Sequence, residues 1–160
     1  MWRDLLSIPS ALSTLRIDEA TPVKYLNVAK RPSGPLEMIQ RDFILRQIQQ
    51  FAQVLAEVLF QKRQNLFELA EQTLAEGIHE LLGLELAEVL QLDRDALIAL
   101  CTTEDWFSGD KAVALADLLH EEGSAAADER ALWLYEAALT SDAALPFNIH
   151  ERIAALRGTR

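Results

Sequence analysis

One stretch of the sequence decides the fold class, 123-GSAAADERALWLYEAAL-139. After the glycine, small and large side chains recur at helical spacing; they are Ala131, Tyr135, Ala138 and Leu139. Small residues let a second helix approach closely, and an aromatic side chain fills the space beside them. The stretch therefore predicts a helix that packs against a neighbouring helix, with Gly123 in the turn before it.

The residues before Gly123 predict that neighbouring helix. Helix-forming residues run over 110–122 and resume over 128–140, and neither segment contains a proline. Leu115, Ala116 and Leu119 fall where the first helix of a tetratricopeptide (TPR) hairpin carries its leucine, small residue and packing aromatic. Residues 112–139 thus resemble one TPR hairpin, and the resemblance implies a helical scaffold that contacts other proteins.

A long helix is predicted over residues 38–62. Its apolar residues step by four, three, four and three positions; they are Ile44, Ile48, Phe51, Leu55 and Val58. We expect Ala52 and Leu59 to widen this stripe, which must be buried against other helices. Two interpretations stay open: the stripe packs inside a bundle, or it joins two copies as a homodimer.

A second helix is predicted after Asn65, because Asn65 and Glu68 have the spacing of a capping box. Its expected apolar stripe is Leu66, Ala70, Leu74, Ile78 and Leu81, and Gly83 should end it. Short helices should follow over 84–90 and over 94–101, the latter capped by Asp93. A loop is expected over 104–109, and a last helix after Asn148.

Residues 38–142 also resemble a group of small bacterial helical proteins without an assigned activity. The resemblance rests on the start, 38-MIQRDF-43, which runs into a long helix, on the turn Gly83-Leu84, and on the TPR-like end. It implies a fold and no activity. The predicted fold class is all-α, an antiparallel helical bundle of α-α hairpins with a TPR-like C-terminal hairpin.

Residues 1–37 are predicted to be an arm and linker before a single helical domain of residues 38–160. Four of the five prolines fall in this arm. Residues 2–15 have the pattern of a short amphipathic helix, and residues 21–30 that of an extended segment. Either the arm is a real extension that docks on the domain or on another protein, or Met38 is the true start of the protein.

Charge and cysteine content restrict the partners and the compartment. The net charge is −10; residues 1–37 carry five basic and four acidic side chains, and residues 38–160 carry ten and twenty-one. An acidic domain repels phosphate backbones, so we expect no nucleic-acid partner. No apolar run approaches the roughly 20 residues that span a bilayer, so we expect no membrane partner. A single cysteine, Cys101, fits a buried thiol in the cytoplasm.

One constellation could hold metal ions. Glu76 and His79, and likewise Asp117 and His120, place an acid and a histidine three residues apart, as in di-metal helical bundles. However, helical geometry at 100° per residue places these side chains away from the apolar stripes. A metal-binding or enzymatic bundle built on these four residues is therefore the alternative hypothesis. The main hypothesis has no cofactor, no metal and no catalytic residue.

A surface for protein partners is the favoured function. Trp133 lies opposite the packed face of its predicted helix, with Leu134 and Ala137 beside it, and Trp106 lies in a predicted loop. A tryptophan on the outer side of a helix is either covered by another segment or available to a partner. The sequence thus predicts a non-catalytic protein-interaction module, with Trp133, Leu134, Ala137 and Trp106 as the candidate contact residues.

Overall fold

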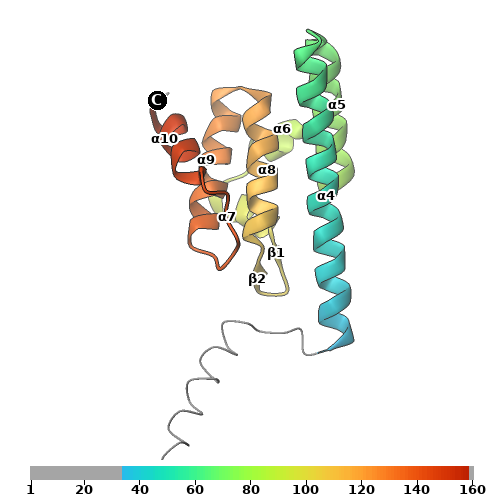
Figure 1. Ribbon diagram of the computed structural model, residues 1–160, viewed down its shortest axis with the longest axis vertical. Helices are drawn as coiled ribbons and strands as arrows, with labels where there is room; N and C mark the ends of the chain where they lie inside the picture. Colours follow the sequence, from blue (N-terminus) through green and yellow to red (C-terminus); the bar gives the residue numbers. More distant parts are fainter. Residues whose placement is uncertain (1–33, 159–160) are drawn as a thin grey trace, which may run out of the picture. The chain divides into compact units, whose positions relative to one another are not determined.

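The computed structural model describes residues 34–158 (Figure 1). The chain divides into two compact units, Met1–Asp42 and Phe43–Arg160. The predictions for the arm, apart from the start of the first helix at Pro35, lie outside the described residues. Residues 34–158 form helices with one very small sheet, which confirms the predicted all-α class. Among these residues, no helix combines the length and the apolar character needed to cross a bilayer.

Helices α4 (Pro35–Arg63) and α5 (Phe67–Leu82) form the first hairpin. Pro35 begins α4, a position where a missing N–H costs nothing. The two helices approach closely at Gly77, where a Cβ atom would lie 2.5 Å from a methyl carbon of Val54. Gly83 ends α5 in the left-handed conformation with φ of 69°, as predicted.

The predicted start of α5 is wrong. Asn65 does not cap the helix: it has a positive φ of 59° and lies in the turn, where the amide N–H of Leu66 donates to the Gln61 carbonyl at 2.9 Å. Helix α5 therefore begins only at Phe67, without a side-chain cap. Asparagine tolerates the left-handed region better than most residues, which explains why Asn65 lies in the turn and not at the N-cap.

Two short helices, α6 (Leu86–Val89) and α7 (Arg94–Ala99), lead to the second half of the fold. The carboxylate of Asp93 accepts the Ala96 N–H at 2.8 Å, which confirms the predicted cap. A capping box that was not predicted lies one helix earlier, where the Glu88 carboxylate accepts the Glu85 N–H at 2.8 Å.

The loop predicted over 104–109 is wrong in part. Strands β1 (Thr102–Thr103) and β2 (Trp106–Phe107) pair antiparallel around a two-residue turn. Both turn residues, Glu104 and Asp105, have positive φ, at 46° and 64°. Such turns normally carry Asn-Gly or Asp-Gly; Glu-Asp lacks this signature, so the hairpin was not predicted.

Helices α8 (Gly109–Glu122) and α9 (Ala125–Leu139) form the second hairpin. Gly123 has φ of 84°, and the Ser124 hydroxyl accepts the Ala127 N–H at 3.2 Å. Helix α9 therefore begins three residues before the predicted 128. Ser124 is a good N-cap and the alanines after it are the best helix formers, so the longer predicted turn was wrong.

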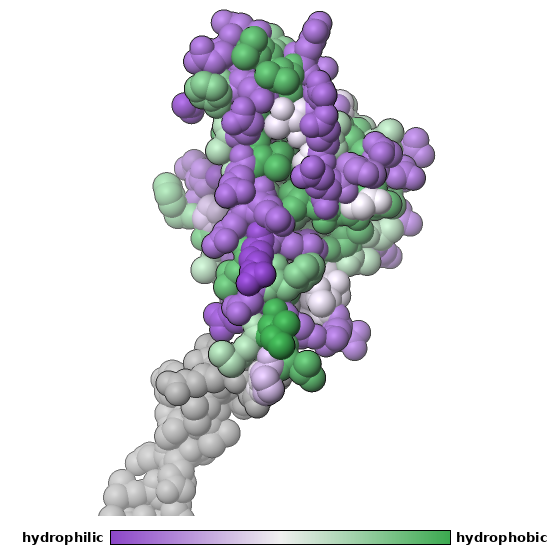
Figure 2. Space-filling view, turned by 90° about the vertical axis from the view of Figure 1, so that its right-hand side faces the viewer, coloured by the Kyte–Doolittle hydropathy of each residue, from purple (hydrophilic) through white to green (hydrophobic). Residues whose placement is uncertain are grey.

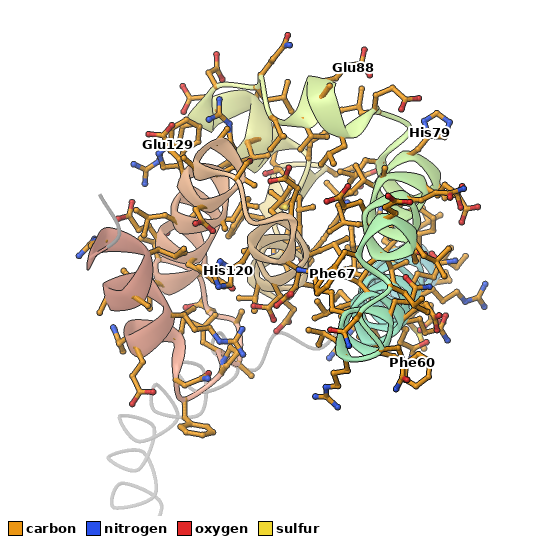
Figure 3. All side chains as sticks on the ribbon, turned by 90° about the horizontal axis from the view of Figure 1, so that it is seen from above. Phe60, Phe67, His79, Glu88, His120 and Glu129 are labelled. Carbon is orange, nitrogen blue, oxygen red and sulfur yellow. The ribbon has the colours of Figure 1, made fainter. Side chains whose placement is uncertain are left out.

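The core of the second unit joins both hairpins and the last helix, α10 (Ile149–Gly158). Figure 3, seen from above, shows α8 between the α4–α5 pair and α9, with α10 on the outer side of α9. In α4 the side chains of Ile44, Phe51 and Val58 are buried within the chain, so this stripe packs inside the fold. Ala52 is exposed and does not widen the stripe as predicted, because α5 packs on the other flank, at Val54.

Candidate functional site

The four candidate metal ligands do not come together. His79 lies on α5 and His120 on α8, and Figure 3 shows them on separate parts of the unit. Each histidine pairs with another acid at the start of the following helix: His79 Nδ1 lies 3.1 Å from Glu85 Oε1, and His120 Nδ1 lies 2.7 Å from Asp128 Oδ1. Both imidazoles are more than half exposed.

The two acids of that set have other partners. Glu76 is exposed and accepts a hydrogen bond from the Gln72 amide at 2.7 Å. Asp117 is half-buried and accepts hydrogen bonds from the Tyr135 hydroxyl and from the Arg152 guanidinium. Within residues 34–158, no group of three or more His, Cys, Asp or Glu side chains is placed to hold a metal ion.

Asp117, Tyr135 and Arg152 form a polar cluster that the sequence did not reveal, because its members come from α8, α9 and α10. The cluster is part-buried. Burial, followed by the hydrogen bond to Asp117, raises the pKa of the Tyr135 hydroxyl well above its ordinary value. Asp117 therefore acts as an acceptor for two donors, which ties α10 to the α8–α9 hairpin.

Two of the four predicted contact residues are not on the surface. Leu134 is fully buried and Ala137 nearly so. They were expected on the outer side of α9, but α7 packs on α9 in addition to α8 and α10. Trp133 is half-buried with the Arg130 guanidinium 5.0 Å from its ring centre, and Trp106 is 57% exposed on β2.

Exposed apolar side chains and a surface depression occur together at the α4–α5 turn. Four large side chains there are about half exposed, a set we call the turn patch: Phe60 57%, Leu66 47%, Phe67 56% and Leu69 45%. A space-filling view of the α4–α5 side shows a few apolar side chains between polar ones at its upper end, where this turn lies (Figure 2).

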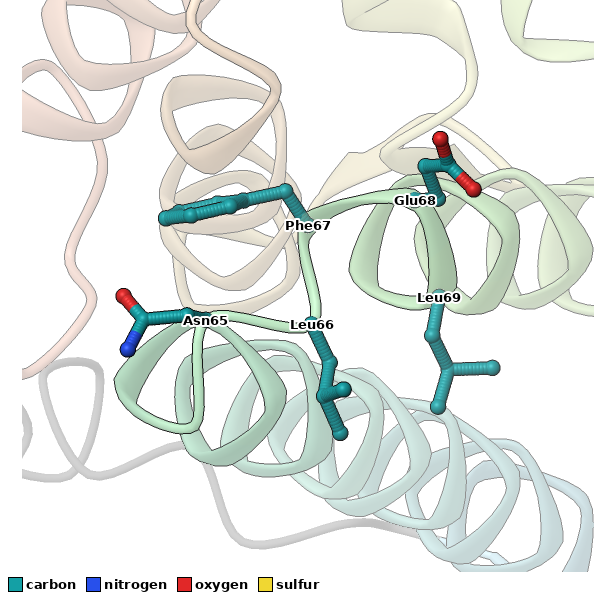
Figure 4. Close-up of a pocket in the computed structure, with 5 residues that line it drawn as sticks. All are labelled: Asn65, Leu66, Phe67, Glu68 and Leu69. Carbon is teal, nitrogen blue, oxygen red and sulfur yellow. The ribbon is translucent and has the colours of Figure 1, made fainter.

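An open depression of about 430 Å³ lies at the same turn, lined by residues 65–69. Figure 4 shows Leu66 and Leu69 pointing the same way, while Phe67 points away from them. Asn65, with its positive φ, lies in the turn between α4 and α5, and Phe67 and Leu69 follow in the first turn of α5, where helical spacing separates their directions. The depression is thus an open, mostly apolar surface, with Phe67 on one side and Leu66 and Leu69 on the other.

The sequence analysis assigned Leu66 to the core and missed the turn patch. Leu66 precedes α5 instead of belonging to it, so the expected stripe begins only at Ala70. A signal was present: at helical spacing Leu66 and Leu69 fall on one side and Phe67 on another, so one buried stripe cannot hold all three.

Burial shifts the pKa values of two side chains, Cys101 and Lys111. Burial raises the pKa of the Cys101 thiol to about 12, with a small opposing effect from Lys111. Lys111, which is 7% exposed, has a pKa lowered by burial. A thiol with a raised pKa is protonated at neutral pH, so Cys101 is a poor nucleophile there. Its burial confirms the predicted buried thiol.

The fold and these surfaces define a class: an all-α protein built from packed helical hairpins. Within that class, the chain belongs to the family of unknown function DUF6483, whose model matches residues 38–131. The match begins at the residue where the resemblance to uncharacterised helical proteins begins, and it ends within α9. Neither the curated proteins nor the solved structures gave a match to this chain.

Proposed function

We propose that this protein is a non-catalytic protein-interaction module that binds another protein through the turn patch. The observation that carries the proposal is the half exposure of Leu66, Phe67 and Leu69, which line an open depression, together with that of Phe60 near the same turn. Soluble domains rarely leave large apolar side chains clustered at one end of a hairpin, and such clusters mark binding surfaces. Aromatic side chains in particular supply most of the energy at protein interfaces.

The chemistry around the turn patch suggests the kind of partner. Glu57, Glu68 and Glu71 are exposed on the same hairpin, and residues 38–160 carry an excess of acidic side chains. We therefore propose a partner segment with an apolar anchor flanked by basic residues, a combination that gains both buried area and long-range attraction. Trp106 and Trp133 remain as secondary contact candidates, and a second copy of the chain remains a candidate partner.

We also propose that the α8–α9 hairpin is of the TPR kind and that the protein works in the bacterial cytoplasm. The pattern of Ala131, Tyr135 and Ala138 supports the first point, because all three are buried in the hairpin as TPR packing residues are expected to be. The lone buried cysteine supports the second. The acidic surface supports the expectation that no nucleic acid is bound.

Co-purification from the source cells tests the proposal. Phe67→Ser should release a partner that the wild-type chain retains, because an apolar anchor is lost from the turn patch. Phe147→Ser is the matched control, since Phe147 is 99% exposed but lies in the loop before α10. Retention of every partner by Phe67→Ser, or equal loss by both variants, would contradict the proposal.

A further inference from the structure

The face of α9 that α10 covers has the features of a helix-binding site. Three aliphatic side chains of α10, Ile149, Ile153 and Leu156, are buried at 3–5% exposure. They recur at i, i+4 and i+7, the spacing by which an amphipathic helix presents one stripe to a surface. Helix α10 packs mainly on α9.

Two carboxylates at the edge of that face select a basic helix. Asp117 on α8 accepts a hydrogen bond from Arg152, and Glu136 on α9 accepts one from Arg157 at 2.7 Å. Glu136 is shared, because Arg94 of α7 also approaches it at 3.4 Å. The Tyr135 hydroxyl donates to Asp117 and so orients the carboxylate toward α10.

The attachment of α10 is local. It is ten residues long, and a nine-residue connection joins it to α9, including Pro146 and the fully exposed Phe147. We expect a short terminal helix with one apolar stripe and two charge contacts to open before the rest of the fold, although its apolar residues lie in the core.

We propose that this face of α9 is a docking site for a basic amphipathic helix of another protein, and that α10 occupies the site until such a helix displaces it. The partner helix carries aliphatic residues at i, i+4 and i+7 and arginines at i+3 and i+8, the pattern of Ile149, Arg152, Ile153, Leu156 and Arg157. Because α10 is tethered to the chain, its effective concentration at the site is high. A partner helix must therefore bind more tightly than α10 does, or bind when α10 has partly detached. This site is separate from the turn patch, so its test does not depend on the proposed function.

The test uses the full-length chain and a labelled synthetic peptide of residues 148–158. In the variant Arg152→Ala with Arg157→Ala, α10 loses both charge contacts, whereas the peptide keeps its arginines. We expect the peptide to bind this variant at least tenfold more tightly than the wild-type chain, by fluorescence anisotropy. Adding Asp117→Asn should weaken that binding at least tenfold. Equal affinity for wild type and variant, or no binding to a variant that circular dichroism shows to be folded, overturns the proposal.

Two further measurements keep the proposal falsifiable if the variant folds poorly. Hydrogen exchange of the wild-type chain should show the amides of α10 exchanging at least a hundredfold faster than those of α9. Protection of α10 equal to that of α9 overturns the proposal, because the site would then never open before the whole unit unfolds. Native mass spectrometry of the chain with Phe67→Ser, which removes an anchor from the turn patch, should show a monomer; a dimer would mean that the α10 of a second copy takes the site, which also overturns the proposal.

Discussion

The two helical hairpins differ in how they bury their residues. In the α8–α9 hairpin, eight of the fourteen residues of α8 and seven of the fifteen of α9 are buried. In the α4–α5 hairpin, four of the sixteen residues of α5 are buried, and the turn between the helices exposes four large apolar side chains. One hairpin places its apolar residues in the core, and the other leaves part of them in solvent.

Small residues explain the difference. Ala112, Ala116, Ala131 and Ala138 are fully buried in α8 and α9, so the two backbones approach along their whole length. Helix α5 has only two buried small residues, Ala70 and Gly77, and Gly77 lies against Val54 of α4. Beyond it the helices carry bulky residues on several faces, and a hairpin can bury only the faces that meet a neighbour. The α8–α9 hairpin therefore contributes more of the buried core, whereas the α4–α5 turn leaves apolar side chains exposed to solvent.

The largest expected effect separates the hairpins directly. Leu118→Ala in α8 should reduce the free energy of unfolding by about 3 kcal/mol, because Leu118 is fully buried and its loss leaves a cavity. Leu69→Ala in the turn patch should reduce it by less than about 1 kcal/mol, since that side chain is 45% exposed. Urea denaturation of both variants measures the two values. Equal losses would mean that the hairpins contribute alike.

A smaller effect tests the single close approach in the α4–α5 hairpin. Gly77→Ala should cost about 1–2 kcal/mol of unfolding free energy, because the new methyl group would overlap the Val54 methyl groups. In a Val54→Ala background the same change should be neutral or stabilising, since alanine favours a helix over glycine. Gly158→Ala is the matched control, as nothing lies within 4 Å of its added Cβ. A cost at Gly77 that Val54→Ala leaves unchanged would refute the contact.

The buried lysine of α8 gives a pH-dependent prediction. The pKa of Lys111 is lowered on folding, so the unfolded chain binds more protons, and stability rises with pH toward the ordinary lysine value of 10.5. Lys111→Met should therefore raise the unfolding free energy at pH 7 by about 1 kcal/mol, and this gain should shrink as the pH rises. Urea midpoints of wild type and variant at several pH values measure the difference. Arg63→Met, at an exposed position, serves as the control; a gain that is independent of pH would speak against a lysine destabilised by burial.

The smallest effect concerns the β1–β2 turn, which lies outside both hairpins. Glu104→Asn with Asp105→Gly should raise the unfolding free energy by about 0.5–1 kcal/mol, because both positions have positive φ and this pair suits the turn. Thermal unfolding measures the gain. A loss of stability would show that the side chains of Glu104 or Asp105 make contacts that outweigh the backbone strain.

The sequence predicted the helices better than their ends. Periodic apolar residues such as Phe51, Val58 and Leu74 identified the core faces correctly, because burial repeats along a helix. The predicted helix ends were wrong at two residues. Asn65 was expected to cap a helix but adopts a left-handed conformation in a turn. Ser124 caps a helix that was expected to begin later. Both residue types serve turns and caps, and the tertiary structure decides between these roles.

The candidate sites were harder to predict than the fold. Leu134 and Ala137 were assigned to a free surface because a helical wheel shows one packed face, whereas α9 is packed by α7, α8 and α10. The Asp117–Tyr135–Arg152 cluster joins three helices through residues up to 35 positions apart. No local pattern encodes such a distance, so sequence periodicity alone could not find it.

Photo-crosslinking in the source cells tests most directly whether the spare apolar surface of the α4–α5 turn binds a protein. A photoreactive phenylalanine analogue is placed at position 67, in the turn patch, and separately at position 147, which is more exposed but lies in another loop. If the turn patch binds a protein, we expect a covalent adduct with one defined protein at position 67 and none of that adduct at position 147. The absence of an adduct at position 67, or the same adducts at both positions, would contradict it.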